Sequence, residues 1–290
     1  MLLHNCIFDA MVYAMKQRYT LHTHSLGFDG KSTVQQMIDT ARDMGFYTIG
    51  ISNHFIVHPN IKQAPMYQYS VRGGYSNIYA SGFDEVMGRF VPHYDELEIL
   101  REQNPDIKIL RGIEVDFFDD LNWQKNFEKC IAILRPDYTI GSCHFILHNG
   151  ALLNSHDWAK ADSNTRDVLL KQYWNNIAIA ATSGLFTWMA HLDLPKKVGL
   201  GRAAKWQEYE DKAVSAIAKS GVGTEINTSG YNTGCDEPYP SIRILKMLAS
   251  ASVPVVISDD AHAASQIGRH FARAENLIHD LGLRRFDITH

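Results

Sequence analysis

The sequence has few cysteines, and they are widely separated. Its 290 residues contain Cys6, Cys130, Cys143 and Cys235, with no CxxC pair. A disulfide framework or an all-cysteine zinc site requires more, or more closely spaced, cysteines. We therefore expect reduced thiols and a cytoplasmic protein.

Features typical of membrane-bound or nucleic-acid-binding proteins are also missing. No apolar run approaches the roughly 20 residues that a membrane-spanning helix needs. Residues 1–15 are apolar but include His4, Asn5 and Asp9 and lack a basic start, which makes them a poor signal peptide. The net charge of −4 does not favour a nucleic-acid partner.

What the sequence does have is an alternation of short apolar runs and longer helical patterns. The runs predict strands at 19–22, 47–52, 107–115, 137–145, 185–191, 222–227 and 253–258. Helical patterns follow them at 32–45, 83–104, 121–134, 164–183, 204–221, 240–251 and 263–282. Such alternation is typical of parallel βαβ units in an α/β protein.

Local signals refine this division of the chain. We expect Ser32 to cap the first of these helices with Gln35 at the capping-box position, and the second to break or kink near Pro92. Residues 1–18 are expected to form a short helical extension, and residues 19–290 one barrel domain. The insertion at 55–80 is rich in Tyr, Pro, Gly and Ser, and we expect it to be a lid-like loop over a site.

Polar side chains recur at the carboxyl end of every predicted strand. In order these are His22 and His24, Ser52 to His54, Glu114 and Asp116, His144, His191 and Asp193, Glu225 and Asn227, and Asp259, Asp260 and His262. In a (β/α) barrel these strand ends meet on one rim, whereas an open sheet would spread them along an edge. The pattern therefore favours a barrel.

Histidines and carboxylates gathered on one rim predict metal binding. Taken singly, His54 could be a loop histidine and Asp260 a helix cap. Together the residues exceed what one ion can coordinate, which predicts two to three divalent ions with Glu114 as a bridge. Imidazole and carboxylate without thiolate suit Zn, Mn or Fe. Clustered ions of this kind hydrolyse phosphoesters, although amide hydrolysis uses similar parts.

The ordered motifs resemble those of the PHP (polymerase and histidinol phosphatase) superfamily. The matching segments are HTH at 22–24, SNH at 52–54, GIEVD at 112–116, GSCH at 141–144, HLD at 191–193 and SDDAH at 258–262. The resemblance covers about residues 19–275. It implies a distorted seven-stranded (β/α)7 TIM-like barrel, which agrees with the strand count.

The same resemblance implies a trinuclear metal site. The implied ligands are His22, His24, Asp29, His54, Glu114, His144, His191, Asp260 and His262. His22 and His24 would share an ion with Glu114 and Asp260, Glu114 would bridge to a second ion, and His54 and His191 would hold the third. Glu114, Asp260, His262 and Asp29 are the implied catalytic residues, and a metal-bridging hydroxide would attack phosphorus.

Softer motifs point to one branch of the superfamily. HLDL at 191–194, INTSG at 226–230 and EPYPS at 237–241 resemble the histidinol-phosphate phosphatases. This implies a phosphoric monoester hydrolase that converts L-histidinol phosphate and water into L-histidinol and phosphate in histidine biosynthesis. Two features depart from the family pattern: Asn53 replaces the usual Asp, and the 55–80 insertion matches no known motif.

Phosphate binding also needs cations beyond the metal ions. The candidates are Arg166, Lys196, Lys197 and Arg202. The expected partner is a small-molecule phosphomonoester, and the sequence predicts no oligomeric state. The alternatives are a PHP phosphoesterase acting on a nucleotide, a sugar phosphate or a phosphotyrosyl protein, a binuclear amidohydrolase, or a barrel that binds without catalysis. An amidohydrolase would need an eighth strand.

Overall fold

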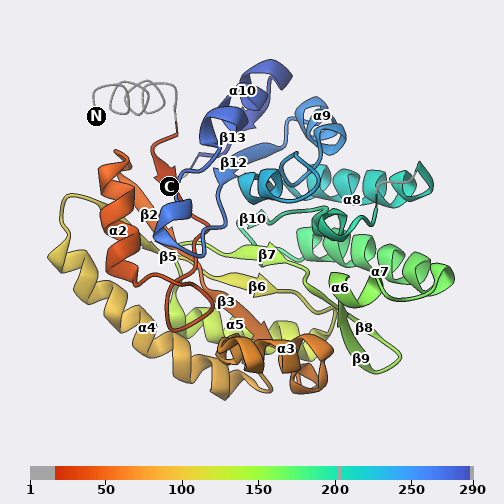
Figure 1. The fold of residues 1–290 in the computed structure, drawn as a ribbon, viewed down its shortest axis with the longest axis horizontal. Coiled ribbons are helices and arrows are strands. Elements are labelled where there is room, and N and C mark those ends of the chain that lie inside the picture. Colours follow the sequence, from red (N-terminus) through yellow and green to blue (C-terminus); the bar gives the residue numbers. More distant parts are fainter. Residues whose placement is uncertain (1–16, 202–203, 288–290) are drawn as a thin grey trace.

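Short parallel strands surrounded by helices form most of the described chain, residues 17–201 and 204–287, in the computed structural model (Figure 1). The strands are β1 Tyr19–Thr20, β2 Thr48–Ile51, β3 His54–Val57, β4 Tyr79–Ala80, β5 Lys108–Arg111, β6 Glu114–Asp116, β7 Ile140–Ser142, β8 Phe145–His148, β9 Ala151–Asn154, β10 Trp188–Met189, β11 Gly223–Asn227, β12 Pro254–Ser258 and β13 Arg284–Arg285. The predicted extension over residues 1–18 lies almost wholly outside the described residues.

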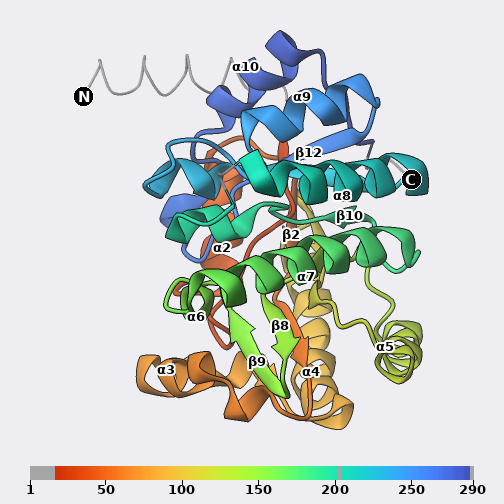
Figure 2. The ribbon, with the colours of Figure 1, turned by 90° about the vertical axis from the view of Figure 1, so that its right-hand side faces the viewer.

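Helices cover the outside of these strands in both views (Figures 1 and 2). They are α2 Val34–Asp43, α3 Pro65–Gly73, α4 Phe83–Gln103, α5 Leu121–Leu134, α6 Ser155–Trp158, α7 Ser163–Thr182, α8 Gln207–Ser220, α9 Ile242–Ser250 and α10 Phe271–Leu281. Short 3-10 helices are η1 Ile61–Gln63, η2 Ser76–Ile78, η3 Leu194–Val198, η4 Ala204–Trp206, η5 Thr228–Asn232 and η6 Ala264–Gln266. No described helix is long and apolar enough to cross a membrane.

The strands follow one another around a barrel, which confirms the predicted fold. One sheet runs β1-β2-β5 and another runs β13-β12-β11-β10-β7-β6-β3-β4, with parallel pairing throughout. The last barrel strand meets the first where Ala261 donates to the His22 carbonyl at 3.2 Å and accepts from the His24 amide at 2.8 Å. Further down, the Gln17 side chain links the two strands by hydrogen bonds to both backbone groups of Ile257.

Several local predictions need correction. The third predicted strand, 107–115, is split into β5 and β6, and β3, which follows β2, was not predicted. The first helix is capped by Thr33 instead of Ser32, and Gln36 instead of Gln35 completes the capping box, because the helix begins one residue later. α4 continues through Pro92. A short strand that was not predicted, β13, pairs with β12.

The 55–80 insertion is more ordered than the predicted loop. It contains the end of β3, the helix α3 and the short strand β4, which pairs with β3. Pro65 occupies the first turn of α3, and Gly74 ends it in the left-handed conformation at φ 78°. α3 contacts β9 of the antiparallel β8-β9 hairpin (Figure 2). Helix and hairpin together frame one side of the barrel rim.

Apolar residues fill the amino-terminal half of the barrel interior. This aromatic plug consists of Leu21, Tyr138, Ile140, Trp188, Ala190 and Val256. Tyr138 stacks on Trp188 with ring centroids 4.8 Å apart, and its hydroxyl donates to the Leu21 carbonyl at 2.5 Å. A second and larger core fills the space between the barrel and its helices. The plug closes the barrel below the polar rim.

Candidate metal centre

The predicted ligands converge at the carboxyl end of the barrel. His22 and His24 follow β1 and are fully buried. His54 begins β3, Glu114 begins β6, His144 follows β7 and His191 follows β10. Asp260 and His262 follow β12. Because parallel strand ends share one rim in a barrel, side chains distant in sequence become neighbours there.

Glu114 lies at the centre of the cluster and is fully buried. Its Oε2 is 3.4 Å from His22 Nε2 and 3.5 Å from His24 Nε2. The same oxygen is 2.7 Å from His54 Nδ1. The other oxygen, Oε1, is 3.0 Å from His191 Nε2 and 3.5 Å from His144 Nε2. A carboxylate with imidazoles on both oxygens is arranged as a bridge between ions.

Two further carboxylates complete the rim. Asp260 Oδ1 lies 3.2 Å from His24 Nε2 and 3.7 Å from His22 Nε2. Asp260 has a φ of 49°, a left-handed conformation that is uncommon for aspartate and is often found at functional sites. Asp29 Oδ2 lies 3.2 Å from both His54 Nε2 and His262 Nε2. Asp29 therefore reaches the cluster from the loop after the first strand.

Gly30 explains how that loop returns to the site. A Cβ atom at this position would lie 2.4 Å from the carbonyl oxygen of His24 and 2.7 Å from the carbonyl carbon of Ser25. Only glycine tolerates such a close backbone approach without displacing the chain. The hydrogen bond from the Gly30 amide to the Ser25 carbonyl, at 3.2 Å, holds the turn that carries Asp29.

The cluster fits divalent metal ions. Two donor atoms of one tetrahedral ion lie roughly 3.4 Å apart when each is about 2.1 Å from it. Several nitrogen-to-oxygen distances here are 3.2–3.7 Å, longer than typical charge-assisted hydrogen bonds. Within the described chain, buried ligand atoms without a hydrogen-bond partner include His22 Nε2, both ring nitrogens of His24, Asp29 Oδ1 and His144 Nδ1. Buried polar atoms rarely remain unpaired, so this donor set suits ions.

The ligand atoms fall into overlapping groups. Within each group they lie within 4.8 Å of one another: His24, Asp29, His54 and His262; His22, His24 and Asp260; His22, Glu114 and His191; and His54, Glu114 and His144. The resemblance placed His22 and His24 around one ion with Glu114 and Asp260; the corresponding group here contains His22, His24 and Asp260 without Glu114. His54 and His191, which the resemblance placed on one ion, fall in different groups, and each of these groups includes Glu114.

Burial and neighbouring charges shape the protonation of the cluster. Burial and the adjacent His262 and His54 rings lower the pKa of His24 to about 4. A neutral imidazole is the form that binds a metal ion. Burial alone would raise the pKa of Glu114, but His54 and His22 outweigh it and hold that pKa well below its usual value. Glu114 is therefore a carboxylate.

Glu225 is a functional residue to which the sequence assigned no role. It is fully buried, and its Oε2 accepts from His22 Nδ1 at 2.9 Å, which turns His22 Nε2 toward Glu114 and Asp260. Its other oxygen accepts from the His191 amide and from the Asn227 side chain, both at 2.9 Å. The only sequence signal was its position at a strand end. A carboxylate behind a ligand histidine fixes the ring orientation.

Asn53, the departure from the family pattern, holds the first histidine motif in place. Its Oδ1 accepts from the Ser25 amide at 2.8 Å, and its Nδ2 lies 3.0 Å from Ser25 Oγ. The same Nδ2 is 3.0 Å from His93 Nε2 on α4. An amide can donate to both groups while accepting from the backbone, which a carboxylate cannot do. Asn53 therefore positions the loop without adding charge beside His54.

The cluster forms the base of a pocket of about 210 Å³. Asp29, His54, His144, His191, Asp260 and His262 line it, together with Lys197 and Phe145. The insertion contributes Met66, Tyr75, Ile78 and Tyr79, and the hairpin side contributes Asn154, Ser155 and His156. The insertion therefore supplies part of the pocket lining.

Of the described cations that were predicted to bind phosphate, only one lines the metal pocket. Lys197 lines the pocket; burial lowers its pKa, while Asp260 and Glu114 act to raise it. Lys196 does not line this pocket, because its buried ammonium pairs with Asp193 at 3.1 Å and donates to the Pro238 carbonyl. Arg166 lies in the first turn of α7, away from the pocket lining. Arg202 lies outside the described residues.

Comparison with known proteins agrees with this geometry. Residues 19–229 match the PHP domain family. A "probable histidinol-phosphatase" of Deinococcus radiodurans is 33% identical over 181 residues, which cover 62% of this chain and 67% of that protein. The histidinol-phosphatase of Saccharomyces cerevisiae is 22% identical over 301 residues, covering 90% of this chain and 88% of that protein.

A solved structure shares the fold. The crystal structure of histidinol phosphate phosphatase from Lactococcus lactis, complexed with zinc, L-histidinol and phosphate, superposes with a TM-score of 0.70 at 17% identity. The match covers 93% of this chain and 95% of that chain.

Proposed function

The chain belongs to the PHP domain family, and from this premise we propose that it is a metal-dependent histidinol-phosphate phosphatase. It hydrolyses L-histidinol phosphate to L-histidinol and phosphate. The relatives from D. radiodurans and S. cerevisiae support this substrate, and the zinc-bound L. lactis enzyme supports the fold. The observation that carries the proposal is the buried cluster around Glu114, which contains unpaired ligand atoms and six of whose residues line one small pocket.

The cluster would hold two to three divalent ions, either Zn, Mn or Fe. The ligands are the nine residues already described: His22, His24, Asp29, His54, Glu114, His144, His191, Asp260 and His262. When bound, such ions stabilise charge on phosphoryl oxygens and supply a water nucleophile near neutral pH. The chain itself contributes a rigid and largely buried ligand set whose orientation is fixed by Glu225 and Asn53.

Lys197 is the residue we assign to the substrate phosphate. Its side chain lines the same pocket as Asp260 and His262, at the point where a phosphate over the cluster would lie. An ammonium donates hydrogen bonds to phosphate oxygens. Its lowered pKa makes it a stronger acid, which eases proton donation to the leaving alkoxide.

The alcohol portion of the substrate would contact the pocket-lining side chains that are not metal ligands. Tyr75 from the insertion and His156 from α6 line this pocket as well. Burial and the adjacent Lys197 lower the pKa of His156, so its ring is neutral at pH 7 and can donate or accept a hydrogen bond. These side chains suit an imidazole-bearing substrate, and Tyr75 is the residue through which the insertion would select among phosphomonoesters.

A substrate panel tests the proposal. The metal-loaded enzyme is assayed with L-histidinol phosphate, a nucleoside monophosphate, a sugar phosphate, a phosphotyrosyl peptide and an aryl phosphate. We expect kcat/KM for L-histidinol phosphate to exceed the others by at least about tenfold, the discrimination that a few specific contacts give. Equal values for the aryl phosphate would refute the substrate assignment while leaving phosphatase activity intact.

Variants test the role of Lys197. Lys197→Ala should lower kcat/KM about ten- to a hundredfold, because a charge-assisted hydrogen bond to phosphate is lost. The exposed Lys160 does not line the pocket, so Lys160→Ala is the matched control and should match the wild type. Unchanged activity in Lys197→Ala would remove this residue from the phosphate site.

A further inference from the structure

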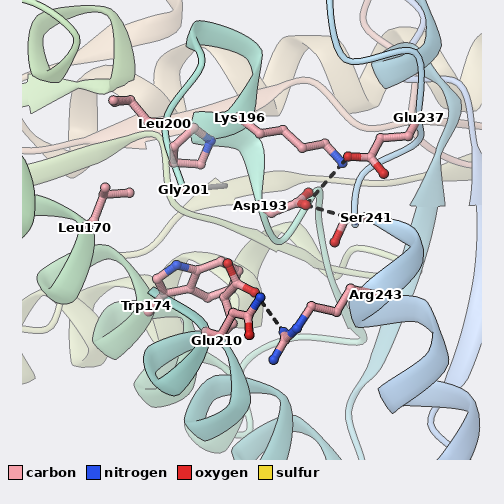
Figure 3. A pocket seen from close by; sticks show the side chains of 12 residues that line it. Leu170, Trp174, Asp193, Lys196, Leu200, Gly201, Glu210, Glu237, Ser241 and Arg243 are labelled. Carbon is pink, nitrogen blue, oxygen red and sulfur yellow. Dashed lines mark hydrogen bonds and ion pairs between the residues drawn. The ribbon is translucent and has the colours of Figure 1, made fainter. Parts of the chain in front are cut away.

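Lys197 is the only Lys or Arg side chain in the described lining of the metal pocket. The neighbouring Lys196 is turned away from it, because its ammonium lies 3.1 Å from Asp193 and 3.5 Å from Glu237 beside a separate cavity (Figure 3). A phosphate group has several strong acceptor oxygens, and a single ammonium leaves some of them to other donors. The remaining donors in the described lining are histidines and uncharged side chains.

Tyr79 is the buried tyrosine of this lining. It begins β4, at the end of the insertion, and 4% of its surface is exposed. Its hydroxyl has no hydrogen-bond partner within the described part of the chain. The same hydroxyl is not among the fully enclosed unpaired atoms of the described residues, so it keeps accessible surface. Tyr79 therefore presents a free and accessible donor in the lining of the metal pocket.

The groups that act on this hydroxyl lie at or beside the metal cluster. Burial raises the pKa of the Tyr79 hydroxyl, and Tyr75, Asp29 and Asp116 raise it further. Asp29 belongs to the ligand set, and Asp116 accepts from the backbone amide of the ligand His144 at 2.7 Å. Electrostatic effects weaken with distance, so a hydroxyl that responds to both carboxylates is close to the cluster. It is protonated at neutral pH and can donate to an anion.

Packing and backbone hydrogen bonds hold Tyr79 in place. β4 pairs in parallel with β3, and Tyr79 lies opposite Ile56. The Tyr79 carbonyl accepts from Arg89 Nη1 of α4 at 3.2 Å. Its ring meets Phe145 and Tyr67 edge to face, with centroids 5.9 Å and 6.0 Å away. A donor that is fixed in this way needs little reorganisation when an anion arrives.

We propose that Tyr79 is a phosphate-binding residue of the metal pocket, and that its hydroxyl donates a hydrogen bond to a non-bridging oxygen of the substrate phosphate. This inference rests on the proposed function, which places the phosphate over the metal cluster. Tyr79 from β4 and Lys197 from η3 contact the phosphate from two different elements. Because the hydroxyl is neutral, it adds a donor without forming an ion pair with the carboxylates of the cluster. The contact is common to all phosphomonoesters, whereas Tyr75 contacts the alcohol portion.

Tyr79→Phe tests the proposal, because it keeps the ring and removes only the hydroxyl. Inorganic phosphate is titrated calorimetrically into the metal-loaded enzyme, and kcat/KM is measured with L-histidinol phosphate and with an aryl phosphate. We expect phosphate to bind about ten- to a hundredfold more weakly, and kcat/KM to fall by a similar factor for both substrates. Tyr67→Phe is the matched control, because Tyr67 packs against the same ring but does not line the pocket. Metal content should equal that of the wild type in both variants.

Three results would overturn the assignment of Tyr79. The first is unchanged phosphate binding and kcat/KM in Tyr79→Phe. The second is a loss of metal ions from this variant, which would make the hydroxyl a support for the ligand Asp29. The third is a loss confined to L-histidinol phosphate, which would place the hydroxyl on the alcohol portion. The proposed function fails separately: a wild type that hydrolyses no phosphomonoester, yet binds phosphate more tightly than Tyr79→Phe, would refute the function and keep the contact.

Discussion

The two ends of the barrel interior contrast sharply although the same strands build both. Along the chain Ile140 of the aromatic plug precedes His144, Trp188 precedes His191 and Val256 precedes Asp260. In the amino-terminal half of the barrel, aromatic and aliphatic side chains pack against one another. At the carboxyl end, buried imidazoles and carboxylates leave ligand atoms unpaired. The comparison indicates that the plug supplies stability and the rim supplies chemistry. Variants at the two ends should therefore have separable effects.

The largest effect is expected at the rim. Glu114→Gln removes the carboxylate that lies among the imidazoles, and should lower kcat about a thousandfold, equivalent to several kcal/mol of lost metal assistance. Metal content per protein, measured by mass spectrometry of the purified sample, should fall as well. Glu102→Gln, at an exposed position near the end of α4, is the control. Full activity with full metal content in Glu114→Gln would contradict the bridging role.

The next largest effect is a loss of stability, expected when the aromatic plug is changed. Trp188→Ala removes a fully buried ring that stacks on Tyr138, and should lower the free energy of unfolding by about 3–5 kcal/mol. Denaturant titration measures this change. The metal content of the folded fraction should stay near that of the wild type. A large loss of metal in the folded protein would show that plug and rim are not separable.

A smaller loss of metal affinity is expected when Glu225, which contacts the ligand His22, is changed. Glu225→Gln keeps the shape of the side chain but weakens its hydrogen bond to His22 Nδ1. Metal affinity should fall about ten- to a hundredfold, as is typical when a partner of a ligand histidine is altered. Competition with a chromophoric chelator measures the affinity. Unaltered affinity would mean that His22 is oriented by packing alone.

The smallest effects come from a pair of glycines. A Cβ at Gly112 would lie 2.3 Å from the Tyr138 hydroxyl, so Gly112→Ala should destabilise the plug by about 1–3 kcal/mol. Gly88 within α4 has no atom within 4 Å of a Cβ at its position, so Gly88→Ala should instead stabilise the chain by about 0.5–1 kcal/mol. Thermal unfolding of both variants gives the comparison, and equal shifts would contradict the plug geometry.

The barrel and its ligands were predictable because both leave local signals. Apolar runs alternating with helical patterns mark the strands, and α5 occurs over Leu121–Leu134 as predicted. Polar residues at strand ends mark the rim, where the structure brings together the nine predicted ligands. Chain order predicts the shared rim, because parallel strands in a barrel place equivalent ends together, whereas the full ligand set and the loop residue Asp29 came from the family resemblance.

Other features depend on tertiary contacts that leave no local signal. The helix within the 55–80 insertion is stabilised by packing against β9, far away in sequence. The adjacent lysines Lys196 and Lys197 looked equivalent, but the turn of η3 sends one to Asp193 and the other to the metal pocket. The role of Glu225 depends on its contact with His22, 203 residues away.

The most direct test of the account is anomalous X-ray diffraction from crystals of the enzyme purified without chelator, collected at the edge of the metal found in the sample. We expect two or three anomalous peaks at the carboxyl end of the barrel, within about 2.0–2.2 Å of donor atoms, with a Glu114 oxygen shared between two of them. No peak at this rim, or peaks bound only by other side chains, would contradict the central claim that these strand ends form a multinuclear metal site.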